Sequence, residues 1–406
     1  MNPTDPMTLP IPGAMPFSLR TGWVLKPNRL TDCLEEKERC GQQVLDLTES
    51  NPTRASLSYP PDLLDDLGNP ENRFYRPLPR GLPSAVETVR DYYRARGMAV
   101  PENRIFLSAS TSESYTHLFR LLGNPGDIFL TPRPSYPLFE FLAQLECVRL
   151  SFYPLAFDGL WHIDFPGLSP CLAPDVRAIL LVHPNNPTGS YVKQPERERL
   201  QQICREHRLA LIVDEVFYDY GLERPADAAD FLDGGHGGVL TFVLNGLSKA
   251  AALPQMKLAW TVVEGPEDVC REALGRMEMI HDTFLSVSTP VQHSASRFLQ
   301  AGESMRRQIL SRLRQNLAFL SEALRGTACT RLPAEGGWFA AVQVPCVQSE
   351  ESWVLGLLEE ENLLLHPGYF FDFMREAYLV FSLLTPPDIF REGVSRFLRY
   401  LQRQLG

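Results

Sequence analysis

Residues 239–257 read VLTFVLNGLSKAAALPQMK, an apolar run followed by a turn that carries one lysine. The apolar part, 239–244, predicts a buried strand. The turn that ends in Ser248 and Lys249 then places an amine at the carboxyl end of that strand, where open α/β sheets bind their ligands. A lysine that is desolvated there can lose its proton and attack a carbonyl carbon to form a Schiff base. For any one lysine a solvated surface position is the commoner case, so this interpretation depends on segments elsewhere in the chain.

The composition is that of an ordinary globular protein of 406 residues, 44% of them hydrophobic and 22% charged. The net charge of −10 argues against nucleic acid or an anionic membrane as a partner, and no apolar run reaches the roughly 18 residues of a membrane helix. Eight cysteines without a C-x-x-C pair indicate a reducing compartment and no metal site. The first 20 residues lack a basic segment followed by an apolar core, so we expect no secretory signal and a cytoplasmic protein.

The middle third of the chain alternates apolar strands with helices. The predicted strands are 178–182, 209–213 and 238–244. Continuous apolar strands that alternate with helices indicate a parallel sheet that is covered on both faces. Asn186, Asp214 and Lys249 each follow one of these strands, so their polar groups should converge at one edge of the sheet.

Two upstream segments carry side chains that suit a planar, phosphorylated ligand. The helix predicted over 109–122 begins with Ser110, Thr111 and Ser112. Free backbone N–H groups and the helix dipole favour an anion at such a position, although Ser and Thr are also ordinary N-caps. Tyr136 lies in a proline-rich turn after a predicted strand, where its ring either stacks on a ligand or packs against the protein.

The last third no longer alternates strictly between strands and helices, which indicates a smaller α+β domain. Its predicted elements are a helix at 303–324, a strand at 338–344, a helix at 349–361, a strand at 377–384 and a final helix that runs to about 404.

Taken together, these segments resemble the class I/II aminotransferases of PLP fold type I, the aspartate-aminotransferase-like group. The resemblance rests on HPNNPTG at 183–189, on Asp214-Glu215-Val216 and on Ser248-Lys249, and it extends over about 44–401. It implies an α/β fold with a mostly parallel central sheet flanked by helices. The implied domains are a large PLP-binding domain at 57–290, a small α+β domain at 291–406 and an N-terminal segment, 1–56, that joins the small domain.

The resemblance also implies roles for residues at matching positions. Lys249 looks like the Schiff-base lysine that shuttles a proton, Asp214 like the partner of the pyridine nitrogen, and Asn186 like a donor to the phenolic oxygen of pyridoxal phosphate. The other implied cofactor contacts are Tyr136, which stacks on the ring, Ser110, Thr111 and Ser112, which hold the phosphate, Ser248, and Tyr75, which reaches the partner subunit's cofactor. A homodimer with shared active sites is therefore implied.

Two cofactor positions depart from the family pattern. The family usually has a tyrosine three residues after the aspartate, where this chain has Phe217. Tyr218 follows one residue later and is the candidate for this cofactor contact, although a one-residue slip in a strand reverses the face. Without that phenol donor the pKa of the Schiff base should rise. The phosphate-binding arginine, eight residues after Lys249, is replaced by Lys257, which offers a point charge rather than a planar fork.

A third departure concerns the substrate. Near the C-terminus the family reads roughly Ile-Arg-Leu-Ser, and the arginine binds the substrate's α-carboxylate; here Val380 takes that position. Either the substrate is an amine without this carboxylate or another cation has moved in. We favour Arg54, because it follows the loop with Asn51 that passes the substrate in relatives, although that loop can also be a plain connector. The other candidate cations are Arg76, Arg80 and Arg375.

The predicted function is that of a PLP-dependent aminotransferase, which moves an amino group from an amino acid to a keto acid through a Schiff base at Lys249. A PLP lyase or decarboxylase, or an amine transaminase, would use the same residues, because the fold does not determine the reaction. A non-catalytic PLP-binding protein is a further alternative, but it would have no chemical need for Lys249, Asp214 and Asn186 together.

Overall fold

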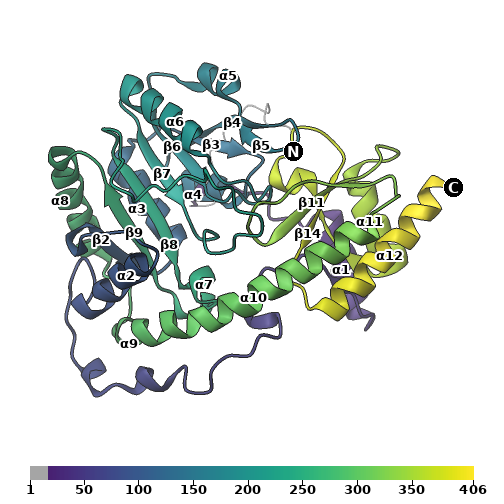
Figure 1. Ribbon diagram of the computed structural model, residues 1–406, viewed down its shortest axis with the longest axis horizontal. Helices are drawn as coiled ribbons and strands as arrows, with labels where there is room; N and C mark the ends of the chain where they lie inside the picture. The colour runs from purple at the N-terminus through teal and green to yellow at the C-terminus, as the bar shows by residue number, and fades with distance from the viewer. Residues whose placement is uncertain (1–16) are drawn as a thin grey trace.

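The computed structural model describes residues 17–406. They form a central eight-stranded sheet with helices on both faces and a smaller sheet beside it (Figure 1). The expectation about a secretory signal and the first part of the predicted 1–56 segment fall on residues 1–16, outside this description.

The central sheet is mixed and mostly parallel, as the apolar strand pattern predicted. Its strands, in spatial order, are β2 (Ile105–Ser108), β9 (Ala259–Glu264), β8 (Thr241–Gly246), β7 (Ala210–Asp214), β6 (Val176–Val182), β3 (Ile128–Arg133), β4 (Arg149–Phe157) and β5 (Trp161–Ile163). The five strands from β8 to β4 run parallel, whereas β2, β9 and β5 pair antiparallel with their neighbours. The parallel strands therefore bring their carboxyl ends to one edge.

Successive residues of the central strands face opposite sides of the sheet, and both sides are buried. On β6, Ala178 and Leu180 pack in the core beneath one helix layer, while Ile179 and Leu181 pack in the core beneath the other. The first layer consists of α3 (Thr111–Leu122), α4 (Leu138–Leu145) and α8 (Glu267–Phe284), and the second includes α2 (Pro83–Ala95) and α6 (Gln194–His207). Burial on two sides explains why these strands read as continuous apolar runs.

The smaller sheet has four strands and its own core. Its order is β10 (Thr330–Arg331), β11 (Phe339–Gln343), β14 (Tyr378–Ser382) and β13 (His366–Pro367). The helices around it are α1 (Arg29–Arg39), α11 (Glu350–Glu361) and α12 (Pro387–Leu405), and a two-stranded ladder joins β1 (Leu45–Asp46) to β12 (Leu363–Leu364). The remaining short helices are α5 (Phe165–Leu168), α7 (Leu247–Ala250) and α9 (Thr289–His293).

Helix α10 (Ala295–Ala323) runs from the central sheet to the smaller one (Figure 1). The sequence pattern predicted a helix from 303, whereas α10 begins at Ala295, so the predicted start was wrong. Gly302 lets α10 cross α7 closely, since a Cβ built there would lie 2.8 Å from the Cα of Ala251. Phe298 belongs to the core of the central sheet and Met305 to that of the smaller one. The helix thus joins both cores, and the predicted domain boundaries remain predictions.

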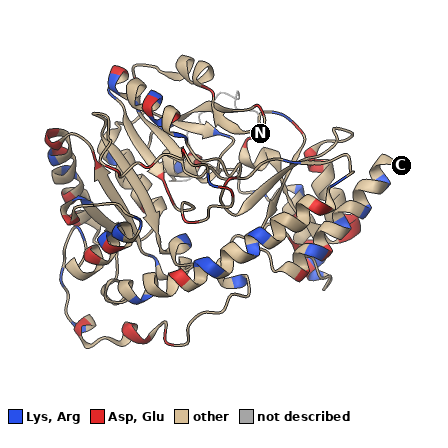
Figure 2. Ribbon diagram, viewed as in Figure 1, with Lys and Arg blue, Asp and Glu red and all other residues tan. Residues whose placement is uncertain are grey.

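Charged residues lie mainly on the outer helices, with both signs mixed along α10 and α12, while the central strands carry few (Figure 2). Among the described residues no helix is both long and apolar enough to cross a membrane.

Candidate active site

Lys249 lies on α7, directly after β8, at the carboxyl edge of the central sheet. Its Nζ donates to the backbone oxygen of Ser50 at 3.3 Å and lies 4.5 Å from the ring centroid of Trp338. Burial lowers the pKa of Lys249 to about 8, although the nearby carboxylates of Asp214 and Glu49 oppose this shift. About one tenth of the amine is therefore neutral, and so nucleophilic, at pH 7, far more than for an ordinary lysine.

Asp214 ends β7, one strand away from Lys249. One carboxylate oxygen accepts from the Tyr115 hydroxyl at 2.9 Å and the other from the Val216 backbone N–H at 3.0 Å. Burial raises the pKa of Asp214 to about 6, while these two hydrogen bonds and Lys249 hold it down. The group thus remains mostly a buried anion at neutral pH, ready to pair with a protonated ring nitrogen.

The start of α3 provides the candidate phosphate site. Thr111 and Ser112 line the same cavity as Lys249 and Asp214, and the first N–H groups of the helix have no intrahelical partner. Ser110 does not line this cavity, because its Oγ is the N-cap and accepts from the Glu113 backbone N–H at 3.1 Å. The side chain of Ser110 is therefore an ordinary N-cap. Its predicted contact with the phosphate is corrected accordingly.

These groups surround one cavity of about 280 Å³ between the two sheets. From the central-sheet side it is lined by Thr111, Ser112, Tyr115, Tyr136, Asn186, Asp214, Phe217, Ser248 and Lys249. The opposite wall comes from the smaller sheet and the η8 turn (Gly368–Phe371) after β13, with Phe339, His366, Phe370 and Phe371. The structure therefore brings together seven of the residues that the sequence nominated: Thr111, Ser112, Tyr136, Asn186, Asp214, Ser248 and Lys249.

Tyr218 does not reach the cavity, so its predicted cofactor contact is corrected. Its hydroxyl donates to Asp230 and accepts from Arg224, and its ring packs against the Arg96 guanidinium at 3.8 Å. Phe217, one residue earlier, is the side chain that lines the cavity. Both residues lie in the turn that follows β7, so this turn, and not a strand period, directs the phenol away from the cavity.

Lys257 is exposed and lies outside the cavity, just after the η7 turn (Pro254–Met256). The predicted phosphate contact is therefore not formed within this chain. Tyr75 also lies outside it, with 77% of its surface exposed. Exposure is what a residue that reaches a partner subunit requires, and that role remains a prediction.

The predicted substrate loop reaches the cavity through Ser50 alone. The side-chain oxygen of Asn51 accepts from the Thr53 backbone N–H, and Arg54 is 75% exposed and pairs with Glu49 at 3.5 Å. Neither side chain lines the cavity in this structure, so a direct substrate contact by Asn51 or Arg54 remains a prediction.

The site fits pyridoxal phosphate. Asn186 lines the cavity, and its Oδ1 is buried without a hydrogen-bond partner among the described residues. The oxygen only accepts, so the NH2 group of this amide would be the donor to a ligand oxygen. Asp214 would hold a protonated pyridine nitrogen, Thr111 and Ser112 a phosphate, Tyr136 the ring face and Lys249 the aldehyde carbon. The donor set therefore matches each polar group of this cofactor.

Two polar lining residues, Tyr115 and His366, were not nominated as site residues from the sequence. Tyr115 lies one helical turn after Thr111, so helical spacing alone could have placed it on the same face. His366 stands in a short strand whose pairing with Val380 makes it part of the wall, and no local pattern reveals that pairing.

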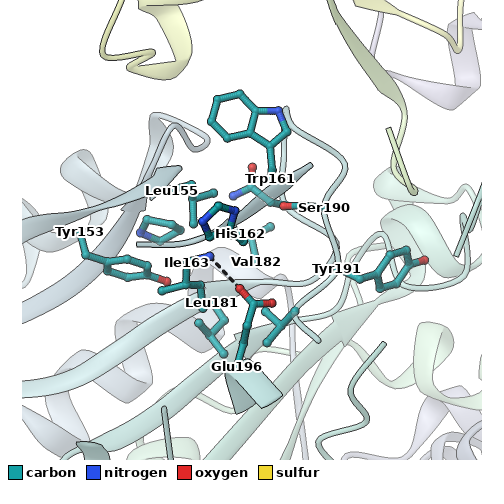
Figure 3. Close-up of a pocket in the computed structure, with 13 residues that line it drawn as sticks. Tyr153, Leu155, Trp161, His162, Ile163, Leu181, Val182, Ser190, Tyr191 and Glu196 are labelled. Atoms are coloured by element: carbon teal, nitrogen blue, oxygen red, sulfur yellow. Dashed lines mark hydrogen bonds between the residues drawn. The ribbon is translucent and has the colours of Figure 1, made fainter. Parts of the chain in front are cut away.

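A second, smaller cavity lies beside the end of β6, near Trp161 and His162 (Figure 3). Its volume is about 20 Å³, and Glu196 next to it accepts from the Ile163 backbone N–H at 2.7 Å. Such a space holds about one water molecule. It is therefore not a substrate site. Nor do residues 17–406 gather three or more His, Cys, Asp or Glu side chains that could hold a metal ion.

Comparisons with known proteins agree with this geometry. The sequence model of the family described as aminotransferase class I and II matches residues 43–389. The glutamate-pyruvate aminotransferase AlaA of Haemophilus influenzae is 27% identical over 386 residues, which cover 91% of this chain and 92% of that protein. The transaminase BacF of Bacillus subtilis is 25% identical over 375 residues, which cover 89% and 90% of the two chains. The solved structure of an alanine aminotransferase from Pyrococcus furiosus matches with a TM-score of 0.84 at 21% identity, over 95% of this chain and all of that one.

Fold and site together define an enzyme of PLP fold type I. The chain belongs to the class I and II aminotransferase family. It is a pyridoxal-phosphate-dependent aminotransferase, so its small-molecule substrates are an amino donor and a keto acceptor. The prediction of family, fold class and enzyme class from the sequence is confirmed.

Proposed function

We propose that this enzyme moves the amino group of an amino acid to a keto acid, with Lys249 as the catalytic residue. The observation that carries the proposal is the placement of Lys249 and Asp214 in one cavity. There the same burial makes the amine partly neutral and keeps the carboxylate dehydrated.

Each lining group then has a task. When bound, pyridoxal phosphate supplies an aldehyde for the amine and a ring that accepts the electron pair released at the substrate's α-carbon. With the cofactor bound, Lys249 would provide the covalent link, give way to the incoming amine, and move a proton from the α-carbon as a general base. Asp214 would keep a proton on the ring nitrogen, Tyr136 would cover the ring face, and Asn186 would donate to the phenolic oxygen.

We also propose that the enzyme is a cytoplasmic homodimer with shared active sites. Lys249 is the only Lys or Arg among the described residues that line the cavity, so its own chain offers no free cation to a phosphate there. An exposed Tyr75 that reaches across to the partner would add a phosphate contact. Sedimentation of the loaded enzyme, with wild type and Tyr75→Ala compared for retention of the cofactor, tests this arrangement; a fully loaded monomer would contradict it.

The reaction itself is tested by an absorbance scan of the PLP-loaded protein with a panel of amino acids and simple amines. Conversion of the cofactor band by an amino acid, and its restoration by a keto acid, is the expected result. Lys249→Ala should abolish the conversion, while Lys26→Ala, at an exposed position, should not. Ammonia release without a keto acceptor would indicate a lyase, and a fixed spectrum would indicate a binding protein.

The second candidate is a transaminase for amines that lack an α-carboxylate. It is favoured by one observation: Val380 is buried on β14 and offers no charge. Conversion by amines alone in the same scan would select this candidate.

A further inference from the structure

The α-carboxylate of an amino-acid donor needs a hydrogen-bond donor in the cavity. Lys249 is committed to the covalent link and to proton transfer. Among the described residues that line the cavity there is no other Lys or Arg. Arg54 is outside it, exposed and already paired with Glu49. Within the same chain, the candidates for a partner of the carboxylate are therefore the polar groups of the wall.

His366 is the one polar side chain among those that the smaller sheet and its η8 turn contribute to that wall. In the antiparallel pairing His366 stands opposite Val380, and Phe339 stands opposite Ser382. Because directly paired residues share a face and alternate residues of a strand repeat it, His366, Val380 and Phe339 lie on the same, cavity-facing side. His366 is thus the direct strand neighbour of Val380, which is buried and carries no charge.

The imidazole of His366 is held in one orientation. Its ring stacks on Phe370 with centroids 4.9 Å apart and an angle of 5°, and the edge contact with Phe371 has a centroid distance of 5.5 Å. Burial lowers the pKa of His366 to about 4, so the ring is neutral at pH 7 and keeps one N–H to donate. A donor that is fixed in place loses little freedom when a ligand binds.

We propose that His366 donates the hydrogen bond that holds the substrate's α-carboxylate, and that the amino donor is a monocarboxylic amino acid with an apolar side chain. This proposal rests on the proposed function. The remaining wall is aromatic, with Phe217, Phe339, Phe370 and Phe371. A second carboxylate on the substrate's side chain would meet these rings and find no donor, which burial makes costly.

The test compares two donors that differ only in the carboxylate, L-phenylalanine and 2-phenylethylamine, in single-turnover conversion of the loaded enzyme. Wild type should prefer the amino acid. His366→Phe should lower that preference about ten-fold to a hundred-fold, through KM, which is the range for one hydrogen bond to a charged group. His366→Gln keeps an N–H and should retain part of the preference. His207→Phe, at an exposed position on α6, is the matched control.

A direct binding measurement tests the role of His366 even if the enzyme converts none of the amino donors. Calorimetry of the loaded protein with 3-phenylpropanoate and its neutral amide should show a preference for the acid that His366→Phe removes. Unfolding temperature and cofactor content report whether each variant is folded and loaded.

The proposal is overturned if folded His366→Phe keeps the wild-type preference, if wild type prefers the amine, or if Arg54→Ala removes the preference instead. If no donor is converted, the proposed function fails, and the acid-over-amide preference then decides the role of His366 alone.

Discussion

Removal of the Tyr115 hydroxyl should weaken cofactor binding below neutral pH and leave it unchanged at high pH. Tyr115→Phe deletes the donor that lies 2.9 Å from the Asp214 carboxylate and leaves the ring in place. Burial already raises the pKa of Asp214 to about 6, and the Tyr115 hydrogen bond is one of the contacts that keep it from rising further. Without it, the carboxylate should become harder to ionise.

A hydrogen bond to a charged group contributes about 1.5–3 kcal/mol, which corresponds to roughly one to two pKa units. The pKa of Asp214 should therefore move from about 6 to about 7.5. At pH 6.5 the ionised share would fall from about three quarters to about one tenth, which weakens the binding of a protonated pyridine about eight-fold. At pH 9 the carboxylate is ionised in both proteins, and the difference should vanish.

The assay is the dissociation constant of pyridoxal phosphate for the cofactor-free protein, measured by fluorescence titration from pH 6 to pH 9. Tyr153→Phe is the control, since it removes an equally buried hydroxyl that donates to the Leu180 backbone oxygen and lies outside the cavity. Equal affinities of Tyr115→Phe and wild type at pH 6.5, or a loss that persists unchanged at pH 9, would refute the reasoning.

Three further outcomes are expected. Phe217→Tyr restores a phenol beside Lys249 and should lower the pH midpoint of the loaded enzyme's visible band by about one unit, because the donor stabilises the deprotonated form; an unchanged absorbance titration contradicts this. In the cofactor-free protein, Lys249 should react with a small acylating reagent faster as pH rises through about 8, since only the neutral amine reacts; a midpoint near that of a free lysine in a mass-spectrometric time course would be against it. Gly302→Ala should destabilise the fold by about 1–3 kcal/mol in urea unfolding, since the added Cβ meets α7, whereas Gly275→Ala on α8, where a Cβ meets nothing within 4 Å, should not. Equal stabilities of the two glycine variants would count against the close crossing.

Much of the site was predictable because its residues follow apolar strands. Asn186, Asp214 and Lys249 stand at or just after the carboxyl ends of β6, β7 and β8, which run parallel to one another and so end at one edge. Strand periodicity and family motifs are local properties of the chain, so they can be recognised in the sequence without knowledge of the packing. The helix predicted from 303 begins at Ala295 instead, and the close contact of its Gly302 with α7 depends on the packing of distant segments.

Side-chain direction and long-range pairing lay beyond the sequence pattern. Tyr218 points to Asp230 and Ser110 caps α3, because contacts formed on folding compete with the cavity for each polar group. His366 belongs to the wall through its register with Val380, and Tyr115 reaches Asp214 across 99 positions of sequence. Local periodicity therefore establishes the sheet, its carboxyl edge and the Lys249–Asp214 pair. The packing of the smaller sheet against that edge determines which side chains can meet a ligand, because such contacts depend on register and burial between distant segments.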